Sequence, residues 1–144
     1  AGGIVNGHDM AEMIKLGASG VQMATRFVLS EECTVSDEFK QIYLQAGQED
    51  VVIIKSPVGL PGRAIRNALV QRIEAGQSPK PEECLRCLKK CSHDYCIIKA
   101  LINSTEGLVD EGIVFSGQNV YKIKDILPVA TIFANILDEY HQAR

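Results

Sequence analysis

The chain has 144 residues, of which 46% are hydrophobic and 23% charged, and its formal net charge is −3 at pH 7. These values are ordinary for a globular domain, and the dispersed basic residues argue against a nucleic-acid-binding surface. Apolar runs such as Val51–Ile54 are far too short to span a bilayer. We therefore expect a small-molecule substrate, with neither a nucleic acid nor a membrane as partner.

The N-terminal stretch, residues 1–30, predicts a strand end, a helix and a second strand. Gly2-Gly3 permits a tight turn. Asp9 is suitably placed to cap a helix that Gly17 ends. Gly20–Ala24 is a short apolar run bounded by glycine and by Thr25, which is typical of a buried parallel strand. Strand, helix and strand at this spacing form half of a βαβ unit.

After Ser30 the apolar periodicity becomes mainly helical. Asp125 is placed to cap a final helix with apolar residues at a period of 3.6. Earlier helices are expected within residues 39–46, 63–75 and 97–107, and a short strand over 51–54. Residues 112–119 form a short apolar run that breaks at Gly117. We therefore predict an α/β fold in which residues 1–30 end a TIM (β/α)8 barrel and residues 31–144 form a mainly helical C-terminal region.

The glycines of the N-terminal stretch have two interpretations. Barrels of this class commonly bind phosphate between the loops that follow strands 7 and 8, with backbone N–H groups as donors. Gly2-Gly3 and Ala24-Thr25 would be those loops, and the Thr25 hydroxyl would add a donor. Glycine also occurs in ordinary βα turns, so the spacing alone leaves both interpretations open.

Four stretches carry a family resemblance: AGGI at the start, LGASGVQMATRF after it, SPVGLPGRAIRN in the middle and GIVFSGQN near the end. Together they resemble the C-terminal end of the nitronate monooxygenase family, formerly called 2-nitropropane dioxygenases. That family also includes the flavin-dependent enoyl-[acyl-carrier-protein] reductases. The resemblance implies an FMN-dependent oxidoreductase on a TIM barrel, of which this chain would hold the last two strands.

The resemblance also implies a cofactor site. The family's phosphate-binding glycines fall on Gly2 and Gly3, and its QMGT loop falls on Gln22, Met23, Ala24 and Thr25. Alanine at position 24 keeps the N–H donor of the family's glycine but restricts the backbone. The family's catalytic histidine lies in a glycine-rich motif upstream of these loops, and no histidine of this chain lies in such a motif. We therefore assign no catalytic residue to this chain.

Cys84, Cys87, Cys91 and Cys96 lie close together in the sequence. Four thiolates suffice for a tetrahedral zinc site or an iron–sulfur cluster. Alternatively, Pro81–Glu83 could begin a helix that buries the first three thiols in the core. A third interpretation is redox-active chemistry of these cysteines. Disulfides at this spacing would close only tiny loops, which indicates a reducing, cytoplasmic compartment.

Three functions follow from these observations. The first is oxidation of alkyl nitronates by an FMN enzyme of the nitronate monooxygenase type. The second is reduction of enoyl thioesters by a related FMN enzyme. The third is a non-catalytic module that binds a phosphate ligand or a partner. Because the chain begins inside a motif, we expect a fragment, and an exposed barrel edge would favour homo-oligomers or association with other chains.

Overall fold

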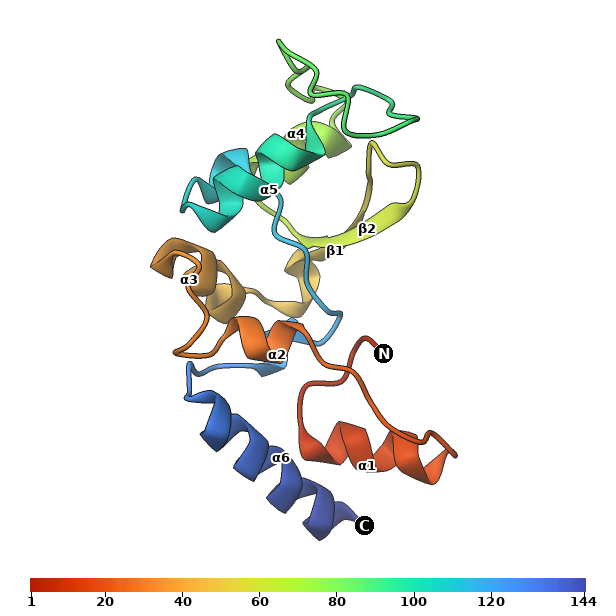
Figure 1. Ribbon diagram of the computed structural model, residues 1–144, viewed down its shortest axis with the longest axis vertical. Helices are drawn as coiled ribbons and strands as arrows, with labels where there is room; N and C mark the ends of the chain where they lie inside the picture. Colours follow the sequence, from red (N-terminus) through yellow and green to blue (C-terminus); the bar gives the residue numbers. More distant parts are fainter.

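The computed structural model describes residues 1–144. The elements follow one another as α1 (Gly7–Lys15), α2 (Thr25–Val28), α3 (Asp37–Gln45), β1 (Val51–Lys55), β2 (Pro61–Ile65), α4 (Ala68–Glu74), α5 (Ile97–Thr105) and α6 (Val129–Ala143), with short 3₁₀ turns between them. Figure 1 shows an elongated molecule with α1 and α6 side by side at one end, and the hairpin, α4 and α5 at the other. Neither α6 nor any shorter helix has the length and apolar character needed to cross a membrane.

The sheet consists of two antiparallel strands, β1 and β2, paired from Val51 opposite Ile65 to Lys55 opposite Pro61. This confirms the strand predicted over 51–54. The helix predicted over 63–75 is wrong at its start, because residues 63–65 pair with β1. Helix α4 begins after Asn67, whose Oδ1 accepts a hydrogen bond from the Val70 N–H at 2.9 Å.

The apolar run over 112–119 forms only an isolated bridge between Phe115 and Ala64. Two backbone hydrogen bonds flank this bridge: the Ile65 N–H donates to the Val114 carbonyl at 2.9 Å, and the Ser116 N–H donates to the Arg63 carbonyl at 3.1 Å. A turn follows at Gln118 and Asn119. The run therefore lies against β2 without continuing as a third strand.

The N-terminal stretch contains the expected helix but no strand. Asn6 caps α1, with its Oδ1 accepting from the Asp9 N–H at 2.8 Å, so the prediction that Asp9 is the cap is wrong. Residues 20–23 make no backbone–backbone hydrogen bond, and no strand is formed there. The two barrel strands predicted in this region are thus not confirmed, because a parallel strand exists only through ladder bonds to neighbours.

Helix α6 begins later than predicted, at Val129, and Asp125 does not cap it. Pro128 precedes its first turn, and both carboxylate oxygens of Glu32 accept from the Val129 N–H at 2.9 Å. A glutamate from a distant loop therefore satisfies a free N–H at the positive end of the helix. Asp125 instead forms an ion pair with Arg26 at 2.7 Å.

Helices α1 and α6 approach so closely that only glycine fits at their contact. A Cβ on Gly7 would lie 2.1 Å from the backbone oxygen of Ile136. The Gly7 N–H also donates to the Glu139 carboxylate at 2.7 Å, which ties the start of α1 to α6.

Two clusters of buried side chains form the core. The first packs Val5 and Leu29 of the N-terminal stretch against Phe39, Ile65 and Val120. The second lies between the hairpin, α4 and α5, and its members include Ile54, Leu69, Tyr95, Ile97 and Ile113. The first cluster thereby holds the N-terminal stretch against a loop from the end of the chain, which positions the site described next.

Candidate functional site

The first of three converging loops is Gly2-Gly3. Both residues have left-handed backbone angles, with φ of +82° at Gly2 and +74° at Gly3, which other residues rarely adopt. A Cβ on Gly2 would meet no atom within 4 Å. Neither N–H group donates to another backbone group. The loop thus presents two free donors on an open side of the chain.

The second loop is Gln22–Thr25, which leads into α2. Gln22 and Ala24 are exposed, whereas Met23 and Thr25 are half-buried. Ala24 has φ −117° and ψ −55°. Its negative φ does not require glycine. The N–H groups of Thr25 and Arg26 have no intrahelical acceptor.

The third loop, residues 117–119, comes from the far end of the chain. The Gly117 N–H donates to Thr25 Oγ1 at 2.8 Å, and the Asn119 side-chain amide donates to the Gly3 carbonyl at 2.5 Å. A Cβ on Gly117 would lie 3.3 Å from Thr25 Oγ1 and 3.8 Å from the Gly3 nitrogen. These contacts hold all three loops together.

The sequence analysis noted the break at Gly117 but missed the place of this third loop in the site. The available signal was Gly117, which interrupts an apolar run and is followed by two amide residues, Gln118 and Asn119. Such a break is typical of a turn, and amide side chains can secure neighbouring loops through hydrogen bonds.

The three loops together suit an anion. Free backbone N–H groups of Gly2, Gly3, Thr25 and Arg26 are the donors that bind phosphate groups in many proteins. Nearby in sequence, the Ser116 hydroxyl is buried without a hydrogen-bond partner, so it too is free to donate. Small side chains and neutral donors make this a chemically suitable place for a phosphate.

The Arg26 side chain has another role. It is buried, and its Nη1 contacts the Asp125 carboxylate at 2.7 Å. The observed partner of Arg26 is thus a carboxylate. The pair ties α2 to the segment that leads into α6.

Tyr43 holds the segment before the third loop through a side-chain hydrogen bond. Its hydroxyl donates to the Phe115 carbonyl at 2.6 Å, two residues before Gly117. Burial, followed by the nearby Cys33, raises the pKa of Tyr43 well above its usual value. Tyr43 is therefore a neutral hydrogen-bond donor at physiological pH. His8, His93 and His141 are all exposed, and none adjoins the three loops in sequence.

The cysteine segment does not form the helix that the sequence suggested. It has no regular secondary structure, Cys84 and Cys87 are exposed, and Cys91 and Cys96 are half-buried. The interpretation as a stripe of core-facing thiols is therefore wrong. All four thiols are free, and no three metal-binding side chains are held in a coordinating arrangement.

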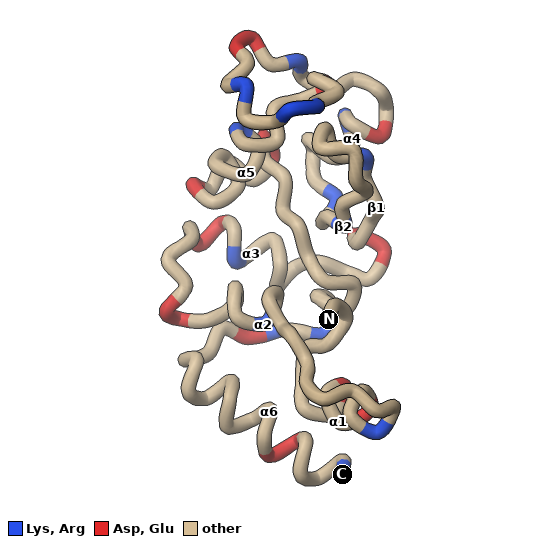
Figure 2. Tube along the Cα trace, turned by 45° about the vertical axis from the view of Figure 1, so that its right-hand side comes forward, with Lys and Arg blue, Asp and Glu red and all other residues tan.

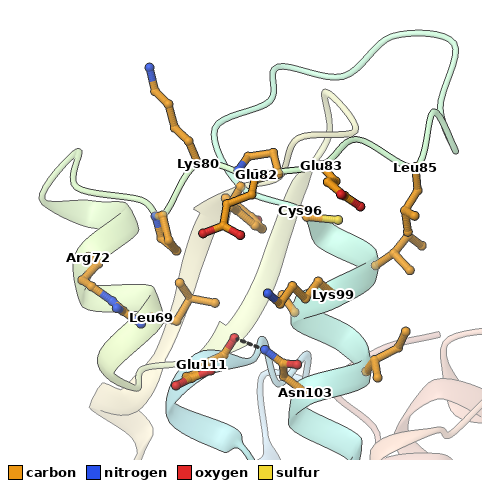
Figure 3. Close-up of a pocket in the computed structure, with 16 residues that line it drawn as sticks. Leu69, Arg72, Lys80, Glu82, Glu83, Leu85, Cys96, Lys99, Asn103 and Glu111 are labelled. Carbon is orange, nitrogen blue, oxygen red and sulfur yellow. Dashed lines mark hydrogen bonds between the residues drawn. The ribbon is translucent and has the colours of Figure 1, made fainter.

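A hollow of about 540 Å³ lies between α4, α5 and the linker at residues 79–85. The close-up in Figure 3 shows charged residues of both signs around it. They are Arg72, Lys80, Lys99, Glu82, Glu83 and Glu111. We refer to it below as the α4–α5 hollow. None of the residues of the three loops lines it, and sequence reasoning did not anticipate it.

Comparison with known proteins gives consistent results. One relative is the (3aS,4S,5R,7aS)-5-hydroxy-7a-methyl-1-oxo-octahydro-1H-indene-4-carboxyl-CoA dehydrogenase of Mycobacterium tuberculosis. It is 42% identical to this chain over 76 residues, which cover 53% of this chain and 21% of that protein. A probable nitronate monooxygenase from Staphylococcus aureus is 28% identical over 148 residues, covering 99% of this chain and 38% of that protein. The solved structure of FabK from Thermotoga maritima has a TM-score of 0.81 and 29% identity, covering 98% of this chain and 43% of that one.

The chain thus spans less than half the length of each of these proteins. The sequence pattern of the family described as nitronate monooxygenase matches residues 1–139, almost the whole chain. This match confirms the resemblance carried by the four sequence stretches, and the chain belongs to the nitronate monooxygenase family.

Proposed function

We propose that this chain supplies the phosphate-binding part of an FMN-dependent oxidoreductase. The observation that carries the proposal is the convergence of Gly2-Gly3, Thr25 and residues 117–119 through two hydrogen bonds. The backbone N–H groups of Gly2, Gly3 and Thr25 have no protein acceptor and match a phosphate monoester. When bound, FMN supplies transfer of one or two electrons.

Each loop has a distinct part in holding the cofactor. The N–H groups of Gly2 and Gly3 donate to phosphate oxygens. Thr25 Oγ1 already accepts from the Gly117 N–H, so its own proton is available for the phosphate. Asn119 holds the Gly3 carbonyl and thereby keeps the Gly3 peptide in one orientation. The chain fixes one end of the flavin, and we assign none of its residues to the chemical step.

The favoured substrate is an alkyl nitronate, in keeping with the family match over residues 1–139. A second candidate is an acyl thioester, with the enzyme acting as an enoyl-thioester reductase. A specific observation favours it: the relative with 42% identity over 76 residues is a carboxyl-CoA dehydrogenase.

Assays of the full-length enzyme that contains this chain separate the two candidates. Oxygen consumption with an alkyl nitronate, without NADH or NADPH, supports the first. Oxidation of NADH or NADPH that depends on an enoyl thioester supports the second. Activity in neither assay would overturn both substrate proposals and leave only the cofactor proposal in place.

The cofactor proposal is tested by comparing FMN with riboflavin, which lacks the phosphate. Flavin fluorescence titrations of the full-length enzyme should give a markedly tighter Kd for FMN, because each hydrogen bond to a charged group contributes about 1.5–3 kcal/mol. Gly2→Val, which introduces a β-branched side chain at φ +82°, should weaken FMN binding and leave riboflavin binding unchanged.

Gly20→Ala is the matched control, because a Cβ there meets no atom within 4 Å. It should leave both affinities unchanged. If Gly2→Val weakens FMN and riboflavin equally, the loops do not bind the phosphate and the proposal is wrong.

A further inference from the structure

The linker and cysteine segment have almost no hydrogen bonds of their own. From residue 78 to residue 91 no backbone N–H or carbonyl takes part in a backbone–backbone hydrogen bond. Figure 1 shows this stretch as an open loop above α4 and α5. Loops of this length without secondary structure are uncommon in compact domains and are usually functional or disordered. Something beyond backbone hydrogen bonds would be needed to order this loop.

All four cysteines of the segment line one small concavity. Cys84, Cys87, Cys91 and Cys96 line a space of about 30 Å³, together with His93. A space of this size accommodates a particle comparable to one water molecule, such as a single ion.

The backbone turns sharply between the members of each cysteine pair. Arg86 lies between Cys84 and Cys87 with φ +49°, and His93 lies between Cys91 and Cys96 with φ +59°. These are the only residues other than glycine with positive φ in the chain. Left-handed geometry is unfavourable for such residues and tends to occur where a site requires a particular turn.

Two of the four sulfur atoms have defined positions relative to the backbone. Cys84 Sγ accepts a hydrogen bond from the Arg86 N–H at 3.4 Å. Cys96 is the N-cap of α5, a helix of nine residues, and its side chain makes no capping hydrogen bond.

We propose that residues 84–96 bind one zinc ion through the thiolates of Cys84, Cys87, Cys91 and Cys96, and that the loop becomes ordered by closing on the metal. Zinc prefers four sulfur or nitrogen ligands in a tetrahedron, with Zn–S distances of about 2.3 Å. Binding releases the proton of each thiol to solvent. Because all four positions are filled by protein ligands, the site is structural rather than catalytic.

Ligation requires movement of the first pair of cysteines. No three metal-binding side chains are in a coordinating arrangement here, so the exposed Cys84 and Cys87 must move toward the half-buried Cys91 and Cys96. This movement breaks no helix, strand or backbone hydrogen bond. A metal site whose ligands assemble only on binding is typical of small zinc-binding units, in which binding energy drives folding.

Zinc would also shape the α4–α5 hollow. Glu83, Leu85 and Cys96 contribute to the wall of this hollow as well as to the small concavity. Four thiolates with Zn²⁺ carry a net charge of −2, and Arg86, Lys89 and Lys90 within the same loop can offset it. Figure 2 shows basic and acidic residues close together in this part of the chain. Closure on the metal would therefore fix one wall of the larger hollow.

Metal analysis of the full chain, purified under reducing conditions with zinc in the growth medium, tests the proposal. We expect about one zinc per chain, as for other structural sites of this kind. Cys84→Ser combined with Cys87→Ser should reduce the zinc content at least tenfold. Cys33→Ser, which changes a cysteine outside the segment, is the matched control and should retain full zinc content.

Limited trypsin digestion gives a readout that does not depend on folding of the variants. Zinc should protect the bonds after Arg86, Lys89 and Lys90 at least tenfold in the wild-type chain, and a chelator should abolish the protection. Retention of less than about 0.1 zinc per chain together with unchanged cleavage would overturn the proposal. Iron with acid-labile sulfide, or disulfides within the segment, would overturn it as well. Each outcome leaves the FMN proposal untouched, since the three loops lie in another part of the chain.

Discussion

Replacement of Thr25 by valine tests whether the contact between the second and third loops stabilises the site. Valine has nearly the same shape as threonine but lacks the hydroxyl that accepts from the Gly117 N–H at 2.8 Å. The partly buried N–H is left without an acceptor, and such a loss costs about 1–3 kcal/mol in the free energy of unfolding. With a urea m-value of about 2 kcal/mol/M, a loss of about 2 kcal/mol lowers the unfolding midpoint by about 1 M.

Urea unfolding of the wild type, Thr25→Val and Thr25→Ser measures this effect. Serine keeps the oxygen, so its midpoint should lie close to that of the wild type, and the m-value should be the same in all three proteins. In the full-length enzyme, Thr25→Val should also weaken FMN binding, whereas Thr25→Ser should not. Equal midpoints for valine and serine would show that the hydrogen bond between Thr25 and Gly117 does not stabilise the loops.

Three further predictions concern the scaffold. Gly7→Ala should lower the free energy of unfolding by about 2 kcal/mol or more, because its Cβ would lie 2.1 Å from a backbone oxygen of α6. The control is Gly20→Ala, which has open space around its Cβ and should change the thermal stability little. Glu32→Ala should lower the free energy of unfolding, measured with urea, by about 0.5–2 kcal/mol, because the cap on α6 is lost. Equal destabilisation by Glu31→Ala would contradict this explanation. Burial raises the pKa of Tyr95 to about 12. Folding favours its neutral form, so stability should be complete below pH 10 and fall between about pH 10 and 12. Tyr95→Phe should flatten that fall in a pH series of unfolding curves.

The sequence predicted those elements whose cause is local. Periodic apolar residues indicated α5 and α6, and the β-branched run at 51–54 indicated β1. Predictions failed where a distant group decided the outcome. Helix α6 begins at Val129 because Glu32 caps it from another loop. Residues 63–65 form a strand because β1 is available to pair with them.

The candidate site could be predicted only in part, again because distant contacts decide part of its structure. Glycine and small residues indicated the first two loops, and the structure shows that both have free N–H groups. The third loop could not be found from local pattern, because its place depends on hydrogen bonds from Gly117 and Asn119 to residues at the start of the chain. The cysteine spacing was compatible with a helix, and only the structure showed that no helix forms there.

The hydrogen bonds that hold the three loops together have a consequence for biosynthesis. They join residues 92 and 116 positions apart in the sequence. Contacts of such long range form late, because the entropy of closing a long loop opposes them. At a translation rate of about 5–20 residues per second, Gly2-Gly3 is made several seconds before Asn119 can secure it. The glycine turn would therefore remain unsecured during synthesis, and the three loops would be joined only after residues 117–119 have left the ribosome.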